Sequence, residues 1–207
     1  IRISFKNQNF TFIPHSLFDK NKIEDYLSFS TPFVKSQEKG TIYKHLSTDA
    51  INVFSYPKII EQFFVSKYPK VKIEIIHQTS AIIEGVIRDN KLSIGKNVFL
   101  HVDYEKITIT VIENKKLIFC NQFDFTSSED FIYYIMFVYN ELDLNPEEIA
   151  LNIFGEIAPN SPLYDAIHKY IKYSNFGKRP KFLNFSYHFD EVFDHKFFST
   201  YAIHLCE

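Results

Sequence analysis

The sequence predicts a mixed α/β fold, and three observations lead to that prediction. Short stretches with strand-like alternation are interspersed with stretches whose apolar residues have helical spacing. The composition is that of a globular protein, with 45% hydrophobic and 23% charged residues in a chain of 207. Turn-forming residues separate the elements, and the chain has no short-period repeat or low-complexity segment.

The first half of the chain mixes short strands with helices. Residues 1–5 and 10–13 alternate around the turn-prone residues 6–9, which predicts a β-hairpin. Asp19 is placed to cap a helix that begins near Ile23. The further expected elements are a loop at 31–40, a strand at 50–56, a helix from 57 to about 67, a strand at 71–76 and a helix at 80–87.

The second half has a more regular order of elements. It begins with three successive antiparallel strands joined by short turns, and continues with helices and strands in alternation. The expected elements are strands at 98–102, 106–112 and 117–125, a helix at 129–142, a strand at 149–154, a helix from 162, a strand at 182–187 and a helix at 197–205.

This order predicts a mixed sheet with helices on its faces, because right-handed crossovers follow a three-stranded meander. That is the ribonuclease H-like topology, and the first half holds a shorter set of the same elements. We therefore expect two ribonuclease H-like domains in the actin-like ATPase arrangement. The first, over residues 1–94, is truncated or degenerate, and the second covers residues 95–207.

The charge balance and the cysteines limit the classes of partner and the compartment. Lys and Arg number 23 against 25 Asp and Glu, and this net charge of −2 argues against bulk electrostatic binding of nucleic acid. No apolar run reaches the ~20 residues of a membrane span, and no signal-peptide pattern is present. Cys120 and Cys206 lie far apart in sequence, so we expect a cytoplasmic protein without a disulfide or a cysteine-based zinc site.

Glycine is scarce, and this bears directly on nucleotide binding. The chain has five glycines, where average usage would give about 15. Neither G-x-G-x-x-G nor G-x-x-x-x-G-K-[ST] occurs, and phosphate loops need clustered glycines so that backbone N–H groups can approach the ligand. Standard nucleotide loops are therefore excluded.

Four short motifs resemble a bacterial family of undetermined role that is assigned the actin-like ATPase fold. They are FTFIPHSLF at 10–18, VFSYP at 53–57, HQTS at 77–80 and VFLHVD at 98–103. The likeness covers nearly the whole chain, and more distantly the chain looks like pilus-assembly and secretion-platform proteins of this fold. The resemblance implies the fold, and it does not assign an activity.

The resemblance also implies where a nucleotide would bind. Active members have an Asp followed by glycines in the first hairpin of the second domain, whereas here Asp103 is followed by Tyr104. Active members also have paired glycines after a later strand, and here Gly155 is followed by Glu156. Asp103, Tyr104, Gly155 and Glu156 thus mark a vestigial nucleotide site, and we expect no cofactor, no metal and no catalytic residues.

Two groups of residues could hold a metal ion. Ribonuclease H-like nucleases bind divalent metal ions with carboxylates on the corresponding strands and helices. Here, however, the carboxylates can equally be residues that end a strand, begin a helix or lie in a loop. The candidates for such a nuclease site are Asp103, Glu129 or Asp130, and Glu156. The segment 188–195 offers a zinc or iron site without an established spacing, and a polar turn is the simpler interpretation. Its candidate ligands are His188, Asp190, Glu191, Asp194 and His195.

Basic and aromatic side chains suggest two kinds of surface. Lys169, Lys172, Lys178, Arg179 and Lys181 alternate with tyrosine and phenylalanine and could bind a single strand of nucleic acid, although a solvated helix end is the simpler interpretation. Residues 131–139 are apolar almost all round, so we expect that helix to be buried on two sides rather than to form an interface. Cys120 is interpreted as a small hydrophobic residue.

The function that these observations favour is a non-catalytic cytoplasmic protein that uses the actin-like scaffold to bind another protein. The aromatic surplus of 23 Phe and 13 Tyr fits such a role. The alternatives are a divergent ATPase in which Asp103 orients a metal-bound water, and a metal-dependent nuclease. An oligomer remains possible.

Overall fold

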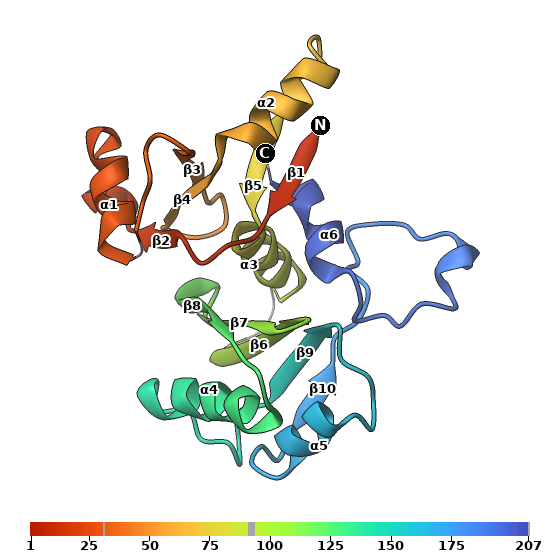
Figure 1. Ribbon diagram of the computed structural model, residues 1–207. Helices are drawn as coiled ribbons and strands as arrows, with labels where there is room; N and C mark the ends of the chain where they lie inside the picture. The colour runs from red at the N-terminus through yellow and green to blue at the C-terminus, as the bar shows by residue number, and fades with distance from the viewer. Residues whose placement is uncertain (31, 91–93, 207) are drawn as a thin grey trace. The chain divides into compact units, whose positions relative to one another are not determined.

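The computed structural model describes residues 1–30, 32–90 and 94–206 of the chain. It divides into two compact units, of which unit 1 comprises Ile1–Glu84 with Ala202–Glu207, and unit 2 comprises Gly85–Tyr201. Figure 1 shows the elements of both units. Within the described part of the chain, no helix is long and apolar enough to cross a membrane.

Unit 1 contains two small sheets and three helices. One sheet pairs two parallel strands, and the other has the order β2-β4-β3 with antiparallel pairing. The elements are β1 (Arg2–Phe5), β2 (Phe10–Ile13), α1 (Ile23–Ser30), β3 (Glu38–Lys44), β4 (Ile51–Pro57), α2 (Lys58–Lys67), β5 (Glu74–His77) and α3 (Gln78–Asp89), which crosses into unit 2. Two 3₁₀ turns, His15–Leu17 and Lys20–Lys22, precede α1. Leu27, Ile51 and Val53 form a buried cluster between α1 and the second sheet.

The predicted hairpin at the start of the chain is wrong. β1 pairs with β5, β2 pairs with β4, and the two strands do not pair with each other. The reason lies in the segment between them, which is hydrogen-bonded to β4. The Asn7 side chain donates to the Ser55 carbonyl (2.9 Å), and the Ser55 N–H donates to the Asn9 carbonyl (3.1 Å). The predicted loop at 31–40 also ends earlier, because β3 begins at Glu38.

Unit 2 is built on one five-stranded sheet of order β10-β9-β6-β7-β8. Its strands are β6 (Lys96–Asp103), β7 (Lys106–Glu113), β8 (Lys116–Asp124), β9 (Leu151–Gly155) and β10 (Ser174–Phe176). The predicted three-stranded antiparallel meander is confirmed by β6, β7 and β8, while β9 and β10 add in parallel. Asn114 and Lys115 both have positive φ in the β7–β8 turn, as a tight two-residue hairpin loop of this kind requires.

The two helices α4 (Ser128–Glu141) and α5 (Pro162–His168) pack on one face of this sheet. Ser127 caps α4 by accepting the Asp130 N–H. Alternate residues of each strand enter the core beneath the helices. The core includes Val98, Leu100, Val102, Ile107, Ile109, Val111, Phe131, Ile135, Val138, Leu151, Ile153 and Ile167.

The end of the chain differs from the prediction. Residues 182–187 do not form a strand, and the sheet instead ends on β10. The Gly177 N–H donates to the Ile153 carbonyl (2.8 Å), which ties residues just after β10 to β9. The predicted helix at 197–205 is α6 (Phe198–Ala202) followed by a 3₁₀ turn.

Candidate functional site

The hairpin that would wrap a phosphate ends in a bulky residue. Asp103 closes β6 and stands opposite Lys106 in the register with β7. Between them, Tyr104 adopts φ 54°, a conformation that glycine tolerates far better, and its side chain is 81% exposed. The turn has the backbone shape that glycine usually supplies, but a tyrosine side chain stands at its tip.

Gly155 is required by the sheet itself. It has φ 92°, and a Cβ at this position would lie 2.0 Å from the Val102 carbonyl oxygen. Its N–H donates to the His195 carbonyl (2.9 Å), and the Glu156 N–H donates to the Val102 carbonyl (2.8 Å). The backbone donors at this position are therefore already bonded within unit 2.

Side chains from the end of unit 2 surround the same position. Glu156 forms an ion pair with Lys196 (3.0 Å), and His195 Nε2 lies 2.9 Å from the Ile157 carbonyl. The Phe176 and Phe193 rings lie 4.4 and 5.6 Å from the imidazole. Burial lowers the pKa of His195, with the Ile157 carbonyl opposing it. The chain's own residues thus occupy the surroundings of Gly155 and Glu156.

The proposed nuclease carboxylates are engaged locally. Asp130 accepts hydrogen bonds from the Thr126 hydroxyl (2.7 Å) and N–H (3.2 Å), which lower its pKa. Glu129 is exposed in the first turn of α4, and backbone N–H bonding lowers its pKa. Among residues 1–30, 32–90 and 94–206, no three His, Cys, Asp or Glu side chains are grouped so that they could hold a metal ion. The nuclease interpretation therefore has no support from the geometry.

Arg179 binds the histidine- and aspartate-rich segment, residues 188–195, through ion pairs and hydrogen bonds. Arg179 forms ion pairs with Asp194 (2.9 Å) and Asp190 (3.5 Å) and donates to the carbonyls of Phe189 and Val192. His188 is exposed in the 3₁₀ turn Tyr187–Phe189. The polar-turn interpretation of the sequence describes this segment.

Three of the five basic residues that could bind a single strand of nucleic acid have partners within the protein. Lys172 pairs with Glu147 (3.3 Å), Arg179 is committed to the segment just described, and Lys181 interacts with Asp89. Burial raises the pKa of Asp89, while Lys181 opposes that shift. Burial also raises the pKa of the Cys120 thiol to about 12, which suits its interpretation as a small hydrophobic residue.

Helix α4 is buried on one side only. Phe131, Ile135 and Val138 face the core, but Tyr133 is 62% and Phe137 42% exposed. The two exposed rings are one helical turn apart and stacked, with centroids 6.3 Å from each other. The expectation of burial on two sides is therefore wrong, and an aromatic pair, Tyr133 and Phe137, is left at the surface.

A pocket of about 540 Å³ opens in unit 2, and the sequence does not predict it. Phe99, Asn152 and Phe154 belong to the sheet face opposite the core, because they alternate with core residues. The other lining residues are Asp89, Asn90, Ser174, Asn175, Phe176, Gly177, Lys178, Arg179 and Lys181.

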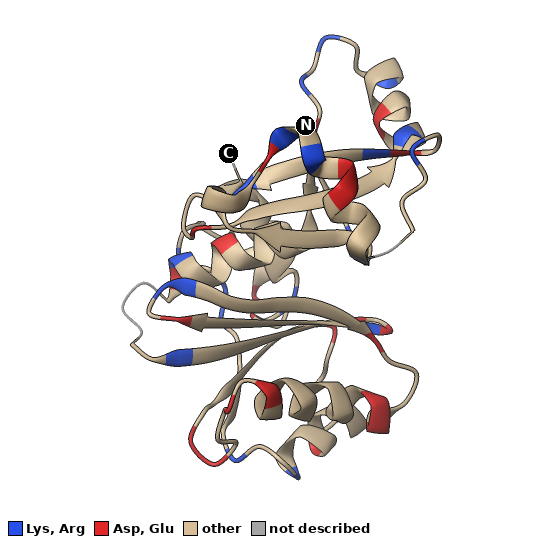
Figure 2. Cartoon of the chain, turned by 90° about the vertical axis from the view of Figure 1, so that its left-hand side faces the viewer, with Lys and Arg blue, Asp and Glu red and all other residues tan. Residues whose placement is uncertain are grey.

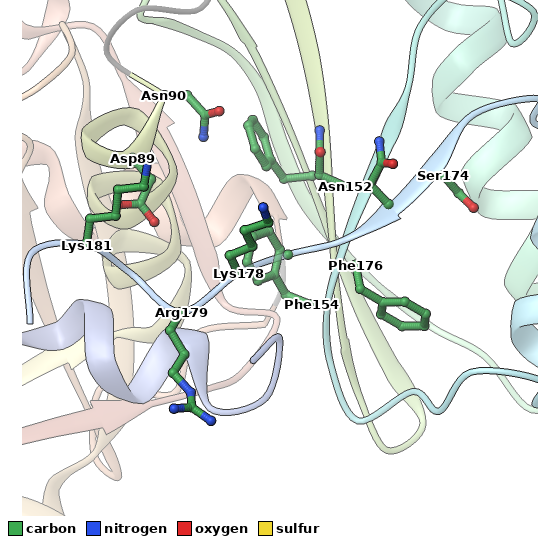
Figure 3. Close-up of a pocket in the computed structure, with 12 residues that line it drawn as sticks. Asp89, Asn90, Asn152, Phe154, Ser174, Phe176, Lys178, Arg179 and Lys181 are labelled. Carbon is green, nitrogen blue, oxygen red and sulfur yellow. The ribbon is translucent and has the colours of Figure 1, made fainter. Parts of the chain in front are cut away.

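Two asparagine side chains that line this pocket are held in place by hydrogen bonds (Figure 3). The Asn90 amide donates to the Val86 carbonyl (2.8 Å), and the Asn152 amide donates to the Val98 carbonyl (3.1 Å). The guanidinium of Arg179 points away from both asparagines in the view. Aromatic rings combined with a few oriented polar groups are typical of a site for a small polar molecule.

Unit 1 contains a buried hydrogen-bonded pair, His45 and Glu84, that no sequence signal indicates. His45 Nδ1 lies 2.8 Å from Glu84 Oε1, and their side chains are 0% and 3% exposed. Glu84 also accepts from the Leu46 N–H (3.1 Å) and the Ser47 hydroxyl (2.7 Å). Because His45 and Glu84 are 39 positions apart, only folding brings them together.

Comparison with known proteins places this geometry in a family. A family described as "Protein of unknown function (DUF3822)" matches residues 1–173. No curated protein matches the chain. The chain is also similar to a crystal structure from Bacteroides thetaiotaomicron VPI-5482, which is described as a protein with actin-like ATPase fold and unknown function. The similarity covers 100% of this chain and 73% of that chain, with 21% sequence identity and a TM-score of 0.82. The chain therefore has the actin-like ATPase fold, and it belongs to the DUF3822 family.

Proposed function

We propose that this protein is a non-catalytic member of the actin-like fold that acts by binding another protein. The proposal rests on the hydrogen bonds that the backbone N–H groups of Gly155 and Glu156 already make. Both N–H groups donate to carbonyls of unit 2, and the Glu156 carboxylate is paired with Lys196. A nucleotide placed there would have to displace these bonds and approach a carboxylate with its own negative charge.

The proposal includes the finer description of the fold. The strand order of unit 2, with three antiparallel strands followed by two parallel ones, supports a ribonuclease H-like domain in residues 95–207. Residues 1–94 would then be the shorter first domain. By its internal contacts the chain divides at residues 84 and 85, inside α3, and residues 202–207 belong with unit 1.

Isothermal titration with ATP–Mg and ADP–Mg tests the absence of nucleotide binding. We expect no binding tighter than about 100 μM. A variant with Lys178→Ala serves as a comparison, because it alters the pocket of Figure 3 and leaves the Asp103 hairpin intact. Tighter binding would refute the absence of nucleotide binding, and its loss in Asp103→Ala but not in Lys178→Ala would assign the nucleotide to the Asp103 hairpin.

The protein-binding part rests on the aromatic pair of α4. Exposed aromatic rings are enriched where proteins meet, and Tyr133 and Phe137 stack without being buried. We expect Tyr133→Ser with Phe137→Ser to abolish recovery of the partner from the native host. Tyr187→Ser, which removes another exposed ring (75%), should leave recovery unchanged. Equal recovery with both variants would count against this surface.

A divergent ATPase is the second candidate, and retention of Asp103 at the end of β6 favours it. Phosphate release by the purified protein that is lost in Asp103→Ala would support it. Release that is absent, or that the substitution leaves unchanged, would eliminate it.

A further inference from the structure

Helix α2 and the turn after it, residues 58–72, form a surface that we call the α2 surface. The structure describes all ten residues of α2, and none of them is buried. In Figure 1 the helix extends away from the strands of unit 1, with the turn at its far end. A helix this short is marginal by itself in water, so a face left without protein contacts calls for an explanation.

The exposed face is apolar. Ile59 and Phe63 lie one helical turn apart and are 71% and 54% exposed. The apolar exposure continues past the helix end, where Tyr68 is 48% and Val71 45% exposed. Val65 adds a further apolar side chain, 48% exposed. Contiguous exposed apolar side chains of this size mark interaction sites.

The same surface is positively charged. It carries four lysines and one acidic residue, although the whole chain has a net charge of −2. The acidic residue, Glu61, has its carboxylate bonded to Lys39 (2.9 Å). The lysines are Lys58, Lys67, Lys70 and Lys72. Lys72 is paired with Glu74 (2.5 Å) and the Lys58 ammonium donates to the Lys35 carbonyl (2.7 Å), so the proposal relies on the charges of Lys67 and Lys70. In Figure 2 the loop after α2, at the top of the picture, shows Lys and no acidic residue.

We propose that the α2 surface docks on the surface of an anionic lipid bilayer. Exposed apolar side chains flanked by lysines are the pattern by which an amphipathic segment lies in the headgroup region. Apolar residues enter the acyl boundary, and the lysines remain with the anionic headgroups. The proposal does not depend on the proposed protein-binding function.

A bilayer fits this surface better than an acidic protein does. The apolar residues occur on one helix face and also around the helix end, and the lysines are spread among them. A fluid bilayer can accommodate apolar side chains in such a distribution, whereas a protein groove binds the apolar residues of one helix face. Binding to an acidic protein is therefore treated as an outcome of the test.

The test is co-sedimentation of the purified chain, residues 1–207, with vesicles. We expect binding to phosphatidylcholine vesicles that contain about 30% phosphatidylglycerol, weaker binding as salt rises, and no binding to phosphatidylcholine alone. Two variants examine the surface: Phe63→Ser, and Lys67→Glu combined with Lys70→Glu. Each should weaken vesicle binding by about tenfold or more.

Matched controls come from α1 and the turn before it. Phe29 is 90% exposed, so Phe29→Ser removes an equally apolar ring elsewhere in unit 1. Lys20→Glu with Lys22→Glu reverses two exposed charges. Both controls should bind vesicles as the unaltered chain does. No binding to anionic vesicles, equal loss in the controls, or full binding by the α2 variants would overturn the proposal, as would capture of an acidic protein by α2 in place of vesicle binding.

Discussion

The buried pair of His45 and Glu84 allows a quantitative prediction. Replacing His45 by Ala removes the partner from a carboxylate that is 3% exposed. The Ser47 hydroxyl and the Leu46 N–H remain as donors, but the hydrogen bond between His45 and Glu84 Oε1 is lost. Removing a hydrogen-bond partner from a buried charged group typically costs about 2–3 kcal/mol, so we expect His45→Ala to lower the free energy of unfolding by about 2–3 kcal/mol.

The assay is urea unfolding at pH 7, followed by circular dichroism. His15→Ala is the control. His15 lies 3.4 Å from Asp49, and because their side chains are 31% and 73% exposed, this contact should contribute less than about 1 kcal/mol. Glu84→Gln combined with His45→Ala should be more stable than the sum of the single effects, because the double variant buries no unpaired charge. A loss below about 1 kcal/mol for His45→Ala, or strict additivity, would refute the reasoning.

The pair also predicts a pH dependence. Burial pushes the pKa of Glu84 upward, but the hydrogen bonds from His45, Ser47 and the Leu46 N–H bring it below its ordinary value of 4.5. A carboxylate with a lowered folded pKa stabilises the protein above its unfolded value, and that stabilisation is lost as the pH falls through the folded pKa. Glu84→Gln should therefore flatten the decline in stability below about pH 4.5.

Three further predictions concern other positions. Gly155→Ala should destabilise unit 2 by about 3 kcal/mol or more in thermal unfolding, because the added Cβ would meet the Val102 backbone. Gly95 also has positive φ, but a Cβ there would have nothing within 4 Å, so Gly95→Ala should cost less. Equal losses of stability in the two variants would contradict the packing argument. Arg179→Lys should speed limited proteolysis within 185–195 because a lysine cannot replace the forked contacts; an unchanged cleavage rate would count against that role. Burial lowers the pKa of His77 to about 4, so the protein should lose about 3 kcal/mol of stability as the pH falls from about 6.5 to 4, and a His77→Gln variant that shows the same loss would exclude this cause.

The local sequence pattern predicts much of the fold of unit 2. The apolar run of β6, the alternation in β7 and β8 and the helical spacing of the apolar residues in α4 are properties of neighbouring residues, so the meander and the long helix could be predicted. The scarcity of glycine and the residues after Asp103 and Gly155 were equally visible. These features depend on spacing of a few positions, which a sequence displays directly.

Contacts between distant residues could not be predicted in this way. β1 pairs with β5 and β2 pairs with β4, and the segment between β1 and β2 is hydrogen-bonded to Ser55, so the local hairpin signal at residues 6–9 was misleading. β10 is too short to show alternation, and its place at the sheet edge follows from pairing with β9.

The sequence by itself determined the order of the regular elements from β6 to α5, the lack of glycine-rich phosphate loops and the supply of aromatic side chains. Tertiary structure decided which of those side chains face water, as for Phe63 and Tyr133, and which polar groups meet, as for His45 with Glu84. The physical reason is that exposure and long-range pairing arise when segments far apart in the chain are packed together. A residue's neighbours in sequence say little about which surfaces remain uncovered.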